Sequence, residues 1–125
     1  DRQFITRHQV NSSVVANFEK ELAEMYSGKT PLTEIPKVSY FAEKANLTPG
    51  YFGDLIKRET GSTPQEIISL RIIAEAKRRL ATTDNDISII AYDLGFQYPQ
   101  HFTRLFKRVT GKSPSAFMTE FHSNN

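Results

Sequence analysis

An internal duplication limits the possible folds of this chain more than any other feature. When the sequence is aligned with itself at an offset of 50 residues, seven of the 13 positions from 52 to 64 are identical, beginning with Phe52 and Phe102. Upstream the offset becomes 49, so the second copy has one additional residue near Tyr98. Such self-similarity indicates one supersecondary unit that is used twice.

Apolar periodicity predicts that both copies are helical, because strand-like alternation is absent from the sequence. Each copy combines a short apolar helix, a tight connection and a longer helix with a basic last turn. Thr48-Pro49 and the capping box Thr63-Pro64-Gln65-Glu66 predict two helix starts. The predicted helices span approximately residues 14–26, 36–45, 49–61, 64–82, 87–94, 99–110 and 114–121.

These patterns predict an all-α fold of seven helices. Two helix-turn-helix subdomains are joined by a long linking helix, and one further helix precedes them. On this linking helix, we expect Lys77, Arg78 and Arg79 to form a solvated face. We predict that residues 1–34 form an N-terminal helix and linker and that residues 35–125 form a DNA-binding domain. Within that domain, the predicted parts are the first helix-turn-helix (35–61), the linking helix (62–83) and the second helix-turn-helix (84–125).

The charge distribution is more informative than the total charge. The 125 residues contain 16 Lys or Arg and 14 Asp or Glu, a net charge of +2. Residues 97–117, however, contain Arg104, Lys107, Arg108 and Lys112 and no acidic residue. A local basic stretch of this kind attracts the phosphates of nucleic acids. In a helix-turn-helix, the second helix enters the DNA major groove.

The second copy offers a polar face suited to base contacts. Its longer helix is predicted to bury Phe102, Leu105 and Phe106, which leaves Gln100, Thr103, Arg104 and Lys107 on the opposite face. Arg can bind guanine with two hydrogen bonds, Gln can pair with adenine, and Thr offers a hydroxyl and a methyl group. The alternative interpretation is an ordinary solvated face. The predicted phosphate contacts are Lys57, Arg58, Lys107, Arg108 and Lys112, although cations in a last helical turn also favour the helix dipole.

The second copy resembles the DNA-binding domain of the AraC/XylS family of bacterial transcription regulators. The resemblance rests on residues 87–96, on 102–108 and on Gly111-Lys112-Ser113-Pro114, and it extends over about Pro36 to Phe121. It implies seven helices, two helix-turn-helix units and a rigid linking helix. It also implies double-stranded DNA and RNA polymerase as partners. His101 and His122 depart from the family, which frequently has Tyr and Arg at these positions.

The resemblance assigns base reading to Gln100, Thr103 and Arg104 in the second copy. The matching positions of the first copy are Gly50, Gly53 and Asp54. Glycine has no side chain to reach a base, and Asp carries a charge that phosphates repel. We therefore predict that the two copies read DNA unequally, and that the first copy depends on Tyr51, with Asp54 as a possible base contact, and on its two basic residues.

Other classes of function find little support in the sequence. No Cys is present, and His8, His101 and His122 are scattered, so we expect no disulfide, metal or other cofactor. No apolar run reaches the roughly 18 to 20 residues of a membrane span. We expect no enzyme, since no motif positions a nucleophile and a repair enzyme would require a reactive Cys or an acid–base pair. A helical protein-interaction domain remains the alternative.

The start of the chain predicts a fragment. It begins at Asp1 rather than Met and has no signal-peptide pattern. We therefore expect a cytoplasmic bacterial protein whose N-terminal sensor or dimerisation domain, common in the AraC/XylS family, is missing here.

Overall fold

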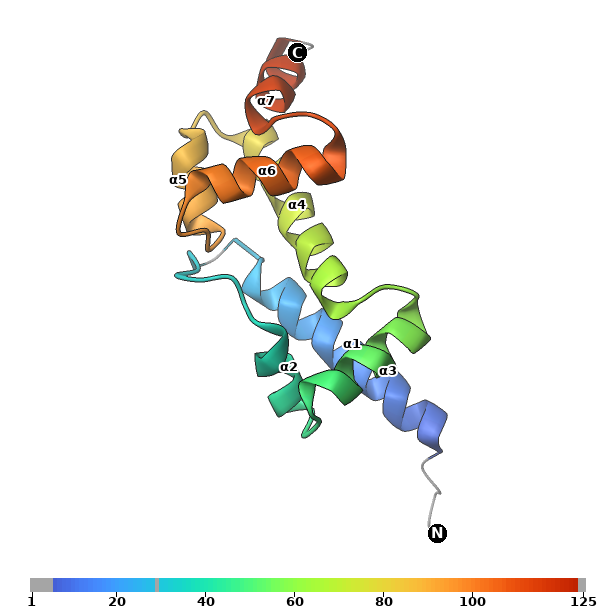
Figure 1. Cartoon of the computed structure of the whole chain (residues 1–125). Coiled ribbons are helices and arrows are strands. Elements are labelled where there is room, and N and C mark those ends of the chain that lie inside the picture. The colour runs from blue at the N-terminus through green and yellow to red at the C-terminus, as the bar shows by residue number, and fades with distance from the viewer. Residues whose placement is uncertain (1–5, 29, 124–125) are drawn as a thin grey trace. The chain divides into compact units, whose positions relative to one another are not determined.

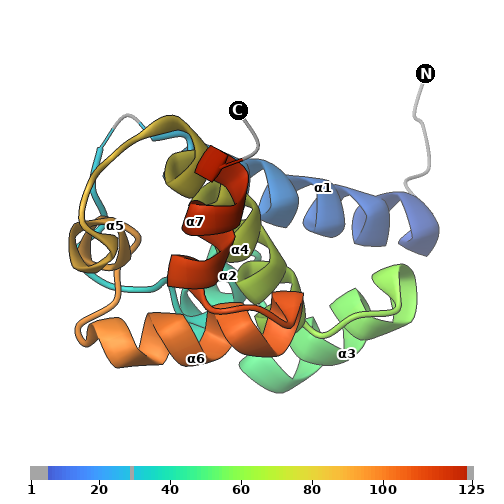
Figure 2. The same ribbon diagram turned by 90° about the horizontal axis from the view of Figure 1, so that it is seen from above.

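The structure, a computed structural model, describes residues 6–28 and 30–123 and contains seven α-helices in that part of the chain (Figures 1 and 2). The all-α fold predicted from the sequence is confirmed. The helices are α1 (Arg7–Met25), α2 (Val38–Lys44), α3 (Pro49–Thr60), α4 (Pro64–Thr82), α5 (Ile87–Asp93), α6 (Pro99–Thr110) and α7 (Pro114–Ser123).

Helix α1 begins at Arg7, well before the predicted start at Val14. Its first turn is closed by a capping box, in which the Gln9 amide donates to Thr6 Oγ1 (3.1 Å) and the Thr6 amide donates to Gln9 Oε1 (2.9 Å). The side chains of this turn are exposed, so apolar periodicity gives no signal there. At the other end of the chain, α7 continues to Ser123 rather than ending near Phe121.

The chain forms two compact units, and α4 passes from one to the other. The first contains residues 6–24 and 36–68, and the second contains residues 25–28, 30–35 and 69–123. Helix α1 therefore belongs to the same unit as α2 and α3. The predicted functional division at residues 34 and 35 stays a prediction.

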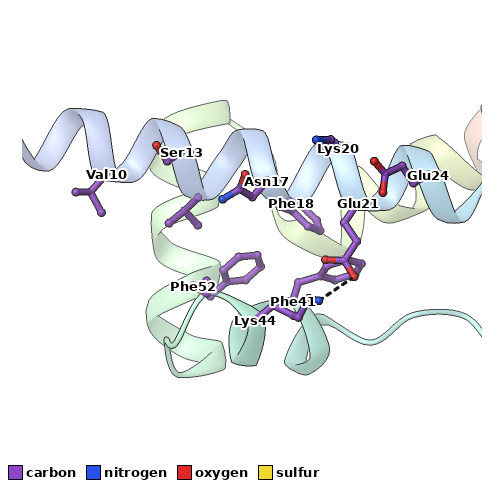
Figure 3. A pocket seen from close by; sticks show the side chains of 12 residues that line it. Val10, Ser13, Asn17, Phe18, Lys20, Glu21, Glu24, Phe41, Lys44 and Phe52 are labelled. Carbon is purple, nitrogen blue, oxygen red and sulfur yellow. Dashed lines mark ion pairs between the residues drawn. The ribbon is translucent and has the colours of Figure 1, made fainter. Parts of the chain in front are cut away.

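Aromatic side chains form the centre of the first unit. Phe18 from α1 packs edge-to-face against Phe41 from α2, with ring centroids 4.8 Å apart, and against Phe52 from α3 at 5.3 Å (Figure 3). Edge-to-face pairs of this kind add about 0.5–1.5 kcal/mol beyond the burial of the rings. Leu55 and Ile56 complete the buried face of α3.

A second row of aromatic rings runs through the other unit. Phe102 contacts Phe96 in the preceding turn at 5.4 Å and Phe106 at 5.8 Å, and Phe106 contacts Phe117 of α7 at 5.6 Å. Figure 2 shows α5 end-on and α6 from the side, so the two helices cross rather than run parallel. Leu105, predicted to be buried with Phe102 and Phe106, is only half-buried.

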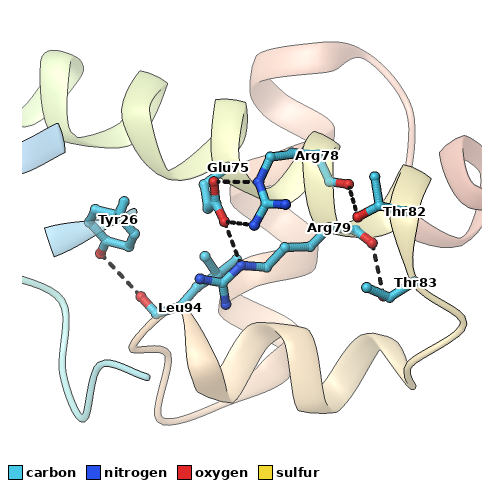
Figure 4. Close-up of polar contacts among 7 residues, drawn as sticks. All are labelled: Tyr26, Glu75, Arg78, Arg79, Thr82, Thr83 and Leu94. Carbon is cyan, nitrogen blue, oxygen red and sulfur yellow. Dashed lines mark hydrogen bonds and ion pairs between the residues drawn. The ribbon is translucent and has the colours of Figure 1, made fainter. Parts of the chain in front are cut away.

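Helix α4 carries a buried carboxylate that two arginines neutralise. Glu75 is 8% exposed, and its Oε2 lies 2.6 Å from Arg78 Nη2 and 2.7 Å from Arg79 Nε (Figure 4). Burial raises the pKa of Glu75, but the hydrogen bonds and charges of the two arginines outweigh this effect and hold the pKa below its ordinary value. The expectation of a solvated face is therefore wrong for Arg79, whose side chain is only 14% exposed.

Candidate nucleic-acid interface

Helix α6 presents a polar face on the side opposite to its buried rings. Phe102 and Phe106 are fully buried, whereas Gln100, Thr103 and Arg104 are exposed. Within the described residues, none of these three polar side chains has a hydrogen-bond or salt-bridge partner. The structure therefore brings the predicted base readers of the second copy together on one open face, near the start of the helix.

The corresponding face of α3 is nearly bare. A Cβ added at Gly50 or at Gly53 would meet nothing within 4 Å, so both positions face open space. Asp54 is exposed beside them. Tyr51, 43% exposed, accepts a hydrogen bond at its hydroxyl from Arg7 Nη1 over 2.9 Å. Arg7 of α1 thus places a cation beside the first turn of α3.

The basic last turns of α3 and α6 have the same backbone structure. Gly61 (φ 85°) and Gly111 (φ 83°) end the two helices in the left-handed conformation, which glycine adopts without a steric penalty. Thr60 and Thr110 each donate their hydroxyl to the last turn, over 2.7 and 2.8 Å. The predicted phosphate contacts that lie in these turns are all exposed: Lys57, Arg58, Lys107 and Arg108.

The fifth predicted phosphate contact has a partner inside the chain. Lys112 follows the glycine that ends α6, and its ammonium forms a salt bridge with Glu120 of α7. Both side chains are about half exposed, at 48% and 55%, so water screens the pair. Lys112 would have to share or exchange this partner in order to bind a phosphate.

The two residues that depart from the AraC/XylS pattern have structural contacts. The His101 ring packs edge-on against Tyr98, with centroids 5.5 Å apart. The His122 Nε2 lies 3.1 Å from the carbonyl oxygen of Leu80, near the end of α4. His122 is therefore directed at the protein backbone, where it takes part in holding α7.

The first unit also contains an open groove of about 760 Å³ between α1 and α2 (Figure 3). Lys44 pairs with Glu21 at 3.9 Å on its wall, and the Tyr40 hydroxyl donates to the same carboxylate. The groove is lined by none of the predicted base readers. In the part of the chain that the structure describes, no cluster of three or more potential metal ligands occurs, and no helix is long and apolar enough to span a bilayer.

Arg7 is the residue of this surface that the sequence interpretation missed. Its position beside Tyr51 depends on the early start of α1, which the spacing of Thr6 and Gln9 could have indicated. The contact between Arg7 and Tyr51 joins residues 44 positions apart, and no local pattern predicts it.

Comparison with known proteins identifies the class. A family model described as a helix-turn-helix domain matches residues 41–120, and the chain belongs to this family. An uncharacterized HTH-type transcriptional regulator of Bacillus subtilis, YobQ, is 31% identical over 87 residues, which are 70% of this chain and 36% of that protein. The transcriptional activator RhaS of Yersinia pestis is 39% identical over 59 residues, 47% of this chain and 22% of RhaS. The matched residues thus cover about a third or less of the length of these relatives.

Solved structures agree on the fold. The DNA-binding domain of AdpA, crystallised with a target DNA, aligns with a TM-score of 0.73 at 24% identity, over 92% of this chain and 95% of that one. A probable AraC family regulator from Rhodopseudomonas palustris aligns with a TM-score of 0.70 at 15% identity, over 87% and 97%. The family model and the curated relatives confirm the AraC-type resemblance seen in the sequence, and the solved structures agree with its fold. This is a family of transcription-regulator domains and not of enzymes.

Proposed function

We propose that this chain is the sequence-specific DNA-binding part of a bacterial transcription regulator, and that α3 and α6 enter successive segments of the major groove. The observation that carries the proposal is the open face of α6, where Gln100, Thr103 and Arg104 stand exposed without partners on a helix fixed by buried Phe rings. The duplicated helix-turn-helix supports two points of entry, about one DNA turn, or ~34 Å, apart.

Helix α6 supplies most of the sequence discrimination. The guanidinium of Arg104 can donate two hydrogen bonds to O6 and N7 of guanine, a pairing worth about 1–3 kcal/mol against a wrong base. Gln100 and Thr103 lie on the same face and can contact adjacent base pairs. Because these side chains form no hydrogen bond or salt bridge within the described residues, they lose no internal partner when they bind DNA.

Helix α3 contributes position rather than sequence preference. Gly50 and Gly53 offer no side chain, and the carboxylate of Asp54 can only accept, for example from cytosine N4. The groups that remain for DNA contacts lie at the edge of the helix. They are the Arg7 guanidinium, which bonds the Tyr51 hydroxyl, and the exposed cations Lys57 and Arg58. Contacts of this type bind phosphates and fix register without reading sequence.

In the whole regulator, this DNA-binding function is joined to a location, to partners and to a controlling domain. Its proposed location is the bacterial cytoplasm, its proposed partners are double-stranded DNA and RNA polymerase, and a sensor or dimerisation domain would control it. The relatives that this chain matches are about twice its length, which leaves room for such a domain in proteins of this kind.

A salt titration against DNA tests the proposal. Binding of the 125-residue chain to a random-sequence duplex and to a duplex selected from a random pool should differ by at least about a thousandfold at moderate salt. Both affinities should fall as salt rises, since bound phosphates release counterions. Equal and weak binding to every duplex would contradict the proposal and favour the second candidate, a helical protein-interaction domain; the paucity of basic residues on the first turns of α3 is the observation that favours it.

A further inference from the structure

The two helix-turn-helix connections share a pattern of backbone hydrogen bonds but have different surroundings. Asn46 in the first copy (φ 59°) and Gly95 in the second (φ 104°) occupy the same left-handed position. The matched hydrogen bonds are Asn46 N to Glu43 O and Gly95 N to Tyr92 O, both 3.0 Å, and Leu47 N to Ala42 O at 2.9 Å and Phe96 N to Ala91 O at 3.1 Å. Asn46 is exposed, whereas Gly95 is buried.

The segment after α1 covers Gly95. We call the described residues of 26–35 the strap. A Cβ added at Gly95 would lie 2.8 Å from the backbone carbon and oxygen of Glu34 and 3.0 Å from the amide nitrogen of Ile35. No real Cβ approaches backbone atoms this closely, so the strap can rest here only because residue 95 is glycine.

Backbone and side-chain bonds hold the strap on the same connection. The Leu32 amide donates to the carbonyl of Asp93 over 3.0 Å, and Leu32 forms an isolated parallel bridge with Leu94. The Tyr26 hydroxyl, almost fully buried, donates to the carbonyl of Leu94 over 3.1 Å (Figure 4). Burial raises the pKa of Tyr26, more than the charge of Arg79 lowers it, so this hydroxyl remains a donor at physiological pH.

The strap acts where α6 has no cap of its own. The residue before α3 is Thr48, whose Oγ1 accepts from the Tyr51 amide over 3.2 Å. The residue before α6 is Tyr98, whose side chain makes no capping hydrogen bond. A side-chain cap stabilises a helix start, and in the second copy that support is missing. The strap instead fixes Leu94 and Gly95, a few residues before the first turn of α6.

We propose that the strap is a positioning element for the second recognition helix, with Tyr26, Leu32 and Gly95 as its positioning residues. A seated strap holds the start of α6 in one orientation, so that Gln100 and Arg104 meet base edges in a fixed register. This inference rests on the proposed function for its DNA consequence. The strap lies upstream of residues 41–120, which the helix-turn-helix family model matches.

The sharpest test exchanges the residues of the two connections. Gly95→Asn introduces the residue that occupies the matching position of the first copy, where φ is 59° rather than 104°, and its side chain displaces Glu34. Asn46→Gly is the matched control, because no strap covers that position. For Gly95→Asn we expect amide hydrogen exchange at Leu32, Phe96 and His101 to accelerate at least about tenfold. We also expect discrimination between bases at the positions that α6 reads to fall about five- to tenfold. Asn46→Gly should change each quantity by less than about twofold.

A milder variant applies if Gly95→Asn fails to fold. Tyr26→Phe removes only the hydroxyl that bonds Leu94, and Tyr40→Phe, an exposed tyrosine of the first unit, is its control. We expect Tyr26→Phe to accelerate exchange at Phe96 and to reduce discrimination by α6 about two- to fivefold, while base pairs next to α3 keep their preference.

Two results would overturn the proposal. One is faster exchange at Leu32 with unchanged exchange at Phe96 and His101, which would mean that the strap does not hold α6. The other is an equal loss of affinity for all DNA sequences, which a general loss of stability explains. If the unmodified chain shows no sequence preference, the proposed function fails, and hydrogen exchange, which requires no DNA, then decides alone whether the strap holds α6.

Discussion

The first and second helix-turn-helix units have nearly the same interior and very different outer faces. Phe52 and Phe102 are both fully buried, and the glycines that end α3 and α6 differ by 2° in φ (85° and 83°). On the outer face, Gly53 and Asp54 stand where the second copy has Thr103 and Arg104. Packing and backbone geometry therefore restrict the interior of a repeat, whereas its exposed face is free to gain or lose a reading function.

The interiors should therefore respond equally to the same damage. Phe52→Ala and Phe102→Ala each leave a large buried cavity, so we expect each to lower the free energy of unfolding by about 3–5 kcal/mol. Urea unfolding measures this, with the exposed Tyr92→Ala as a control that should change stability by no more than about 0.5 kcal/mol. A large loss for one phenylalanine and a small loss for the other would break the equivalence of the two interiors.

The outer faces should respond unequally. Arg104→Ala should relax the preference at one base pair by about 1–3 kcal/mol, because the guanidinium that can donate to both O6 and N7 of guanine is lost. Asp54→Ala should leave base preference nearly flat and strengthen non-specific binding, since a negative charge beside phosphates is removed. A panel of operator point variants measures both. The assignment of the reading helix is reversed if Asp54→Ala erases a cytosine preference and Arg104→Ala changes nothing.

The basic last turns of α3 and α6 should have similar effects on the salt dependence of DNA binding. Replacing Lys107 and Arg108 with Ala should weaken binding to all sequences and flatten the slope of log K against log salt by about 1–2 units. Replacing Lys57 and Arg58 should do the same. Lys77→Ala, an exposed cation on α4, is the control. An unchanged slope would assign the pair in question to its helix dipole or to solvent rather than to phosphate.

The smallest expected effect concerns the bare face of α3. Gly53→Ala should raise the free energy of unfolding by about 0.5–1 kcal/mol, since the added methyl meets open space and alanine favours the helix. Gly61→Ala also meets open space, but its φ of +85° penalises alanine, so that variant should lose about 1 kcal/mol. Thermal or urea unfolding compares the two. Equal changes in both variants would contradict the assignment of Gly53 to an ordinary, uncrowded helix surface.

Local signals predicted most of the fold. The repeat and the caps gave the starts of α3, α4 and α6, and both bonds of the Thr63–Glu66 capping box are present, at 3.1 and 2.8 Å. The missed start of α1 had a similar signal in Thr6 and Gln9, outside the apolar periodicity. The solvated face expected on α4 is wrong at Arg79, because a run of charges does not reveal that the carboxylate of Glu75 is buried beside it.

The candidate site was predictable on α6 and less so elsewhere. The phase of Phe102 and Phe106 determines which side chains face outward, so Arg104 could be placed from sequence alone. The strap could not be predicted, because Tyr26 and Leu94 are 68 residues apart and their bond depends on tertiary packing. Segment 26–35 reads in the sequence only as a connection after a helix. Whether the predicted contacts bind DNA stays a prediction.

Selection of binding sites from a random DNA pool, followed by footprinting of the selected duplex, tests the unequal reading most directly. For the 125-residue chain we predict one segment of roughly 4–6 base pairs with strong preference and a second protected segment, about one DNA turn away, with little preference. Repeating the selection with Arg104→Ala should remove a base from the strong segment. Two segments of equal sequence preference would contradict the account. So would a strong segment that Arg104→Ala leaves intact and Asp54→Ala alters.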